Sequence, residues 1–301
     1  MIVEEGDAGV RRRLAQREPN VRRVFVAGPG AMRGSVAGAV TAELEEHGLM
    51  SLIDVAVGGS TGIFPVLYPA ARQARLGYTI YERECVTSGF ISWRRALMGG
   101  LLVDLDPLFD VFRSSLRAAL DQQAVHRSSM ECYATLTDAQ TGEGVLCNIK
   151  TAGPDVLRPA RATTALPVFS DPIEVNGRLY YDGSIGVPSP IREVIERFKP
   201  DDIIYCTNCT PEYHEHRGAV YKAADAWGVR HTSVGVRVAN ARRSKVFLED
   251  IAYLRSQKQC GYLILWGDPR LHALTQDSRL IGQVMRDTRA QVRELLLKSL
   301  A

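Results

Sequence analysis

The sequence predicts an α/β fold in which at least the first two strands are parallel. Two short apolar segments, residues 24–27 and 52–57, each run through a glycine-rich turn into a segment with helical periodicity. Short apolar runs without polar alternation are typical of strands that are covered on both faces. With 301 residues, 46% of them hydrophobic, the chain can bury a substantial core as one large domain or two small ones.

Charge and composition argue against several classes of protein. A net charge of +3 is too small to indicate a nucleic-acid partner. No run of eighteen apolar residues occurs, so we expect no transmembrane helix. The acidic N-terminus lacks the apolar core of a signal peptide, and six scattered cysteines suggest no disulfide framework. We therefore expect a cytoplasmic protein, and the sequence does not define its oligomeric state.

Cys206-Thr-Asn-Cys209 could form a metal site, because His214 and His216 follow it. However, no second C-x-x-C pair accompanies it, and the apolar run 203–205 directly precedes it. Two small thiols at the end of a strand are the commoner explanation. We expect neither a metal nor another cofactor.

Residues 1–20 are expected to form a flexible polar arm, and residues 21–301 the folded domain. The arm contains Arg11-Arg12-Arg13, which could touch anionic lipid head groups but is more typical of solvated surface.

The first glycine-rich turn, Gly28-Pro-Gly-Ala-Met-Arg-Gly34, lies between strand 24–27 and a helix predicted over 35–47. Backbone N–H groups at a helix N-terminus favour an anion. A dinucleotide cradle would also need an acidic residue at the end of the second strand, and that strand ends instead in a serine turn. An oxyanion hole beside that serine is therefore the favoured interpretation, since parallel neighbouring strands bring both turns to one edge of the sheet.

The second turn, Gly58-Gly59-Ser60-Thr61-Gly62, has the pattern G-x-S-x-G between a strand and a helix predicted over 63–75. In this context a serine can sit in a strained turn with its hydroxyl available as a nucleophile. An ordinary turn with a serine N-cap fits the pattern equally well.

A hairpin is predicted around Asn176-Gly177, and its returning strand, residues 179–181, ends at Asp182-Gly183. Asp182 is either simple turn chemistry or the base that takes a proton from Ser60. In the second case we expect burial by Leu179 and Tyr180 to raise the pKa of Asp182.

Three segments together resemble the signature blocks of the patatin-like phospholipases, most closely the compact bacterial members. They are residues 24–34, residues 54–62, and the pair 162–167 with 181–183, in the family's order. The resemblance implies a three-layer α/β/α sandwich and hydrolysis of lipid or phospholipid esters through an acyl-serine, with contact at the membrane surface as a further expectation.

Carried over position by position, the resemblance makes Ser60 the nucleophile, Asp182 the general base, and Gly58 and Gly62 the flanks of the nucleophile turn. The oxyanion loop then comprises Gly28, Gly30, Ala31 and Arg33. Pro29, Gly59 and Ser184 depart from the family pattern, and Pro29 has no N–H to donate. The alternatives are a non-catalytic lipid-binding or interaction protein and a Ser–Asp–His esterase using His231 or His272.

The remaining segments define the fold more than the chemistry. Strands are predicted at 129–136, 144–149 and 262–266, and the C-terminal part, residues 237–301, is expected to be mainly helical. Residues 90–112 are rich in apolar side chains around Arg94 and Arg95. They are interpreted mainly as core, with an acyl-chain groove as the alternative.

Overall fold

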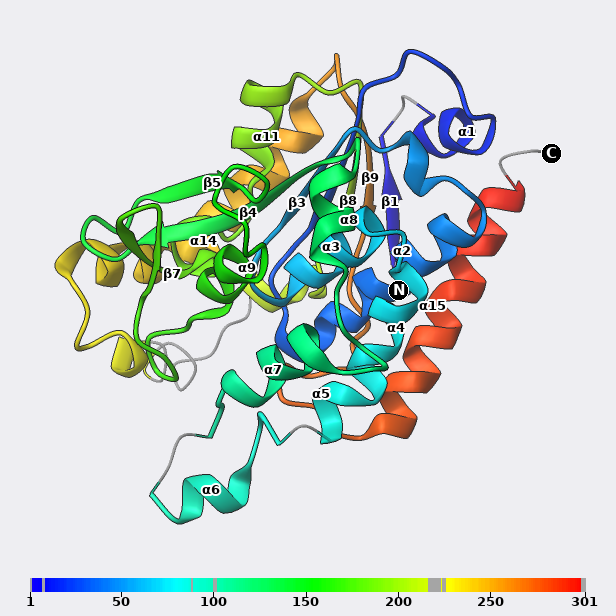
Figure 1. Cartoon of the computed structure of the whole chain (residues 1–301). Helices are drawn as coiled ribbons and strands as arrows, with labels where there is room; N and C mark the ends of the chain where they lie inside the picture. Colours follow the sequence, from blue (N-terminus) through cyan, green and yellow to red (C-terminus); the bar gives the residue numbers. More distant parts are fainter. Residues whose placement is uncertain are drawn as a thin grey trace.

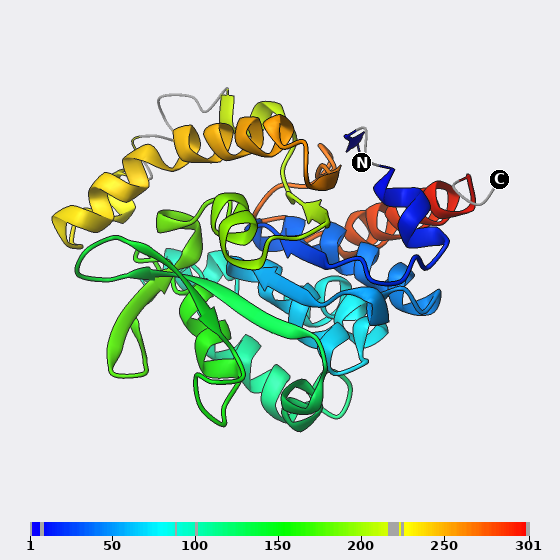
Figure 2. The same ribbon diagram turned by 90° about the horizontal axis from the view of Figure 1, so that it is seen from above.

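A computed structural model describes residues 2–6, 9–87, 89–99, 102–215, 223 and 226–298. In these ranges the chain is built on a mixed, mostly parallel nine-stranded sheet with helices on both faces (Figures 1 and 2). The strand order is β1-β9-β8-β2-β3-β4-β7-β6, and β5 pairs with β4 outside that path. The strands are β1 Val3–Glu5, β2 Arg23–Ala27, β3 Val55–Gly58, β4 Glu131–Asp138, β5 Gly144–Asn148, β6 Ile173–Val175, β7 Arg178–Asp182, β8 Asp202–Cys206 and β9 Gly261–Leu265. This architecture confirms the predicted α/β/α fold.

The centre of the sheet is parallel and its margins are antiparallel. The five neighbouring strands β9, β8, β2, β3 and β4 run in one direction. The pairing of β2 with β3 places Ala27 opposite Gly58, so the two predicted glycine-rich turns leave the same edge of the sheet side by side. The hairpin of β6 and β7 pairs antiparallel with the last residues of β4, beyond the part that pairs with β3 and on the side away from β5.

Helices form the two outer layers. They are α1 Val10–Ala15, α2 Ser35–Glu46, α3 Phe64–Ala70, α4 Ala74–Glu82, α5 Glu84–Thr87, α6 Trp93–Leu97, α7 Asp106–Ser114, α8 Gln122–Arg127, α9 Leu157–Thr164, α10 Gly183–Gly186, α11 Ile191–Phe198, α12 Glu212–Glu215, α14 Val234–Ser256 and α15 Ser278–Lys298, with 3₁₀ turns η1 Ala31–Gly34, η2 Met50–Leu52 and η3 Ser60–Ile63. None of the helices in the described ranges is both long and apolar enough to span a bilayer.

Alternate side chains of each buried strand supply two separate cores. In β2, Phe25 and Ala27 face the core formed with α2, α3, α7 and α15, while Val24 and Val26 face the core formed with α11 and α14. Successive side chains of a strand point to opposite faces, so a strand covered on both faces is apolar throughout. That is why residues 24–27 show no polar alternation.

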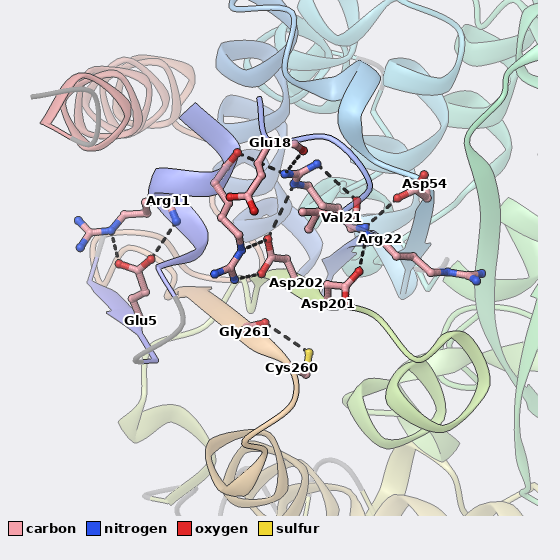
Figure 3. A network of polar contacts seen from close by, with 12 residues as sticks. Glu5, Arg11, Glu18, Val21, Arg22, Asp54, Asp201, Asp202, Cys260 and Gly261 are labelled. Carbon is pink, nitrogen blue, oxygen red and sulfur yellow. Dashed lines mark hydrogen bonds and ion pairs between the residues drawn. The ribbon is translucent and has the colours of Figure 1, made fainter. Parts of the chain in front are cut away.

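The N-terminal segment corrects the prediction of a flexible arm. β1 pairs antiparallel with β9, and Val10 and Leu14 of α1 are fully buried. Polar contacts fasten this segment to the edge of the sheet at which β2 and β8 begin (Figure 3). Arg11 pairs with Glu5, and Arg13 pairs with the buried Asp202. Two of the three arginines therefore form ion pairs within the folded domain.

Several boundaries differ from the predicted ones. The helix predicted over 63–75 is divided into α3 and α4, because the chain turns at Arg72, whose φ of 57° is left-handed. The long C-terminal helix α14 begins at Val234, where the Ser233 hydroxyl accepts a hydrogen bond from the Val236 N–H at 3.3 Å. An N-cap of this kind satisfies a donor that would otherwise have no partner.

Candidate active site

Ser60 and Asp182 are brought together although 122 residues separate them. The Ser60 Oγ donates a hydrogen bond of 2.7 Å to the Asp182 Oδ2. Ser60 opens η3 directly after β3, and Asp182 ends β7; both strands pair with the same side of β4, opposite β5. Asp182 is fully buried and Ser60 is 8% exposed. The two side chains that the patterns single out thus form one buried pair.

The serine is held in a strained turn. Ser60 has a φ of 51°, in the left-handed region that non-glycine residues rarely adopt, at a cost of order 1–3 kcal/mol. Its N–H donates 2.9 Å to the Oγ1 of Thr163, a fully buried residue of α9. This hydrogen bond ties the turn to α9 and was not predicted from the sequence, where Thr163 is one of two adjacent threonines.

The flanking glycines are required by close packing. A Cβ at Gly62 would lie 2.4 Å from the Ala27 carbonyl oxygen, and one at Gly58 would lie 2.6 Å from the Ile63 Cα. Neither position has room for a side chain. The turn therefore needs both glycines to approach β2 and to fold back on itself.

The Asp182 carboxylate is buried but well supplied with donors. Its Oδ1 accepts a 2.8 Å hydrogen bond from the Ser184 N–H, while the Asp182 N–H donates 2.9 Å to the Ala165 carbonyl. Burial raises the pKa of Asp182 to about 6, opposed by the hydrogen bonds from Ser184 and Ser60 and by the charge of Arg243. Burial disfavours the charged form, which makes this aspartate a stronger base than an exposed one.

The direction of that pKa shift was predicted, but its structural origin was not. Leu179 is 51% exposed and does not shield the carboxylate. Asp182 is enclosed instead by β4, where it pairs with Leu136, and by the end of α9 at Ala165. The burial thus comes from elements distant in sequence.

The loop after β2 offers two N–H groups beside the serine turn. The Gly28 N–H already donates 2.8 Å to the Cys206 carbonyl and Pro29 has no N–H, so neither can bind an oxyanion. Gly28 therefore belongs to the oxyanion loop as a structural position and not as a donor. In the described part of the chain, the N–H groups of Gly30 and Ala31 have no acceptor.

Several hydrogen bonds fix this loop to the serine turn and to neighbouring segments. The Thr61 hydroxyl donates 2.8 Å to the carbonyl of Ala31, whose φ of 51° is also left-handed. The Asn208 Nδ2 donates 2.6 Å to the Gly28 carbonyl from the end of β8. The Met32 N–H donates 3.1 Å to the Ala273 carbonyl. The roles of Thr61 and Asn208 could not be predicted from the sequence, because their contacts are made only in the folded chain.

Arg33 stabilises the backbone of the loop. Its Nε donates 3.2 Å to the Gly30 carbonyl, and its guanidinium lies over the ring of Tyr213, 4.2 Å from the centroid. A cation over an aromatic face is attracted by the ring quadrupole. These contacts give Arg33 a role in fixing the backbone of the loop.

Two departures from the family pattern fit their surroundings. A Cβ at Gly59 would lie 2.9 Å from the Oγ1 of the buried Thr135, so Thr135 leaves no room for a larger residue at position 59. Ser184 contributes its backbone N–H to Asp182, which any residue except proline could do at that position.

Histidine is not part of the pair. Asp182 accepts directly from Ser60, whereas His231 and His272 are both exposed.

Among the described residues no group of three His, Cys, Asp or Glu side chains is placed to hold a metal ion. Cys206 and Cys209 are buried, while His216 and the side chain of His214 lie outside the described residues.

Comparison with known proteins adds little to this geometry. No protein-family model and no curated protein matches the sequence. Among solved structures, the crystal structure of VipD from Legionella pneumophila aligns with a TM-score of 0.44 and 11% identity, covering 93% of this chain and 67% of that chain. A similarity this low carries no information on function, which has to be inferred from the site.

Proposed function

We propose that this protein is a serine hydrolase of lipid carboxylic esters that uses a Ser60–Asp182 dyad. The observation that carries the proposal is the direct 2.7 Å hydrogen bond between the Ser60 hydroxyl and a buried carboxylate. A serine is a weak nucleophile unless an adjacent base accepts its proton. Here the base lies within hydrogen-bond distance and has a raised pKa.

The reaction would proceed through two acyl transfers. In the first, Asp182 accepts the Ser60 proton as the Oγ attacks the ester carbonyl, and the same proton passes to the departing alcohol. In the second, a water molecule gives its proton to Asp182 and attacks the acyl-serine, which releases the carboxylic acid and returns the proton to Ser60.

The tetrahedral oxyanion would be bound by the N–H groups of Gly30 and Ala31. Both are free of other acceptors in the described chain, and the Thr61 hydroxyl fastens their loop to the serine turn. One donor of this kind typically stabilises the transition state by about 3 kcal/mol. Because the donors are already fixed, little reorganisation is needed during the reaction.

The choice of lipid esters rests on sequence resemblance. Residues 24–34, 54–62, 162–167 and 181–183 resemble the signature blocks of the patatin-like phospholipases. The site geometry by itself supports ester hydrolysis in general. We therefore propose lipid or phospholipid esters as the substrate class.

Labelling with a fluorophosphonate tests the nucleophile directly. We expect a single covalent adduct on the peptide that contains Ser60, detected by mass spectrometry, and none in Ser60→Ala. Ser189→Ala, which removes another buried serine hydroxyl, should be labelled like the wild type. A folded wild-type protein that takes no label, or that is labelled elsewhere, would contradict the proposal.

Thr163 should be required for the serine geometry. Thr163→Val removes the acceptor of the Ser60 N–H, and an unsatisfied buried donor costs about 1–3 kcal/mol. We expect kcat to fall roughly 10- to 100-fold with little change in KM. Thr163→Ser, which restores a hydroxyl, should recover most of the activity. Equal activity of the valine and serine variants would show that this hydrogen bond does not position Ser60.

A further inference from the structure

A hairpin formed by residues 89–99 and 102–104, the α6 hairpin, projects from the body of the protein (Figure 1). Its base is built like a two-stranded ribbon: Ile91 bridges Val103, and the Ser92 N–H donates 2.9 Å to the Leu102 carbonyl. The Arg95 guanidinium donates 2.9 Å to the Phe90 carbonyl. The base is therefore fixed to the fold, with Phe90 and Ile91 buried.

The far end of the α6 hairpin is apolar and basic. Leu97 is 88% exposed and its neighbour Met98 is 71% exposed, while Arg94 is exposed on the same short helix. Within the hairpin, Arg94 and Arg95 are basic, and its one acidic residue, Asp104, lies at the base. Exposed apolar side chains that are contiguous and rimmed by polar residues mark sites of interaction with proteins or membranes. The charge favours an anionic partner.

Hydrogen bonds connect the α6 hairpin to the oxyanion loop. The Gln276 Nε2 donates 2.9 Å to the Ile91 carbonyl at the hairpin base. Three residues earlier, the Ala273 carbonyl accepts from the Met32 N–H, next to Ala31. The hairpin thus stands at the edge of the sheet where β2 and β3 end and where Ser60 lies (Figure 1).

We propose that the α6 hairpin docks the protein onto a bilayer that contains anionic phospholipid. Leu97 and Met98 enter the boundary between head groups and acyl chains, and Arg94 contacts the lipid phosphates. Apolar side chains flanked by cations are the features that bind such an interface. This inference rests on the proposed function for its purpose, which is to place the Ser60 edge of the molecule at a surface of ester substrate.

Vesicle sedimentation tests the docking independently of catalysis. Ser60→Ala protein is mixed with sucrose-loaded vesicles of phosphatidylcholine, or of equimolar phosphatidylcholine and phosphatidylglycerol. We expect stronger binding to the anionic vesicles. Leu97→Ser combined with Met98→Ser should weaken binding about tenfold or more on both compositions. Arg94→Gln should weaken it about fivefold on anionic vesicles only.

Val238→Ser is the matched control, because Val238 is an exposed apolar residue of α14, which covers the opposite face of the sheet. It should bind as well as the unmodified protein. Absence of vesicle binding, or equal binding by the Leu97/Met98 variant, would overturn the docking proposal.

Hydrolysis of a soluble short-chain ester by the otherwise wild-type protein separates the two proposals. If that ester is not hydrolysed while vesicle binding still depends on Leu97 and Met98, the hydrolase proposal fails and the docking stands. If the ester is hydrolysed and the tip substitutions leave vesicle binding unchanged, the docking fails alone.

Discussion

Asp182→Asn should lower kcat for a soluble ester by about three orders of magnitude while the chain remains folded. General-base catalysis typically contributes 10²- to 10⁴-fold, and an amide cannot take the Ser60 proton. The asparagine oxygen can still accept the Ser184 N–H, so the turn after β7 should persist. Steady-state kinetics on a p-nitrophenyl ester, with circular dichroism as a check on folding, measures the effect.

Asp250→Asn is the matched control for this substitution. Asp250 is also a buried carboxyl, and burial raises its pKa to about 7, but it lies on α14 near Arg192. We expect its replacement to leave kcat unchanged. Retention of full activity by Asp182→Asn would exclude the dyad.

The raised pKa of Asp182 has opposite consequences for activity and for stability. The carboxylate is the active form, so kcat in the wild type should fall as the pH drops through about 6. For stability, the folded pKa of about 6 exceeds the ordinary aspartate pKa of 3.8 expected in the unfolded chain, so the folded state binds the proton more tightly than the unfolded state. The resulting destabilisation is present in full above pH 6 and disappears below about pH 4.

Asp182→Asn should therefore raise the free energy of unfolding at pH 8, by up to about 3 kcal/mol, while it lowers kcat. Urea unfolding at pH 8 and at pH 4 measures this difference, which should be largest at the higher pH. A variant less stable than the wild type at pH 8 would show that the hydrogen bonds from Ser60 and Ser184 outweigh the cost of burial.

Local sequence patterns were sufficient for the strands and turns that carry the site. The apolar runs before Gly28 and Gly58 are β2 and β3, and Asn176-Gly177 is a hairpin turn. These features depend on backbone preferences and burial within a few residues. From the residues alone, the pairing with Ser60 is one of two interpretations of Asp182, because no local rule links residues 122 positions apart; the family resemblance favours it.

Contacts made only in the folded chain could not be predicted. Arg13 was interpreted as solvated surface because its neighbours in sequence are charged, yet it meets Asp202, a buried residue of β8. The resemblance places Gly28 in the oxyanion loop, whose backbone N–H groups would bind the oxyanion. Its N–H is instead taken by Cys206, which the parallel pairing of β2 with β8 brings alongside. In each case the partner lies in β8, which is distant along the chain but pairs with β2 in the sheet.

Gly62→Ala should both destabilise the fold and impair the site. The added Cβ would lie 2.4 Å from the Ala27 carbonyl oxygen and 2.5 Å from that of Gly28. Both are backbone atoms at the end of β2, so no side chain can rotate away, and the serine turn and the oxyanion loop must separate. Overpacking of this kind typically costs about 1–3 kcal/mol. A displacement near 1 Å between reacting groups can cost about 10²-fold in rate.

Gly38→Ala is the control that separates steric position from the loss of a glycine as such. Gly38 lies in α2, where a Cβ would meet the Tyr81 ring at 3.3 Å, and alanine favours a helix by about 1 kcal/mol. The Tyr81 ring is buried and its hydroxyl donates 2.8 Å to the Thr61 carbonyl, so the ring must shift by a few tenths of an ångström against this hydrogen bond. We expect stability within about 1 kcal/mol of the wild type and a loss of kcat far smaller than in Gly62→Ala. Urea unfolding and ester kinetics on both variants make the comparison. If Gly62→Ala behaved like Gly38→Ala, the close approach of the serine turn to β2 could not be what sets the geometry between Ser60 and the N–H groups of Gly30 and Ala31.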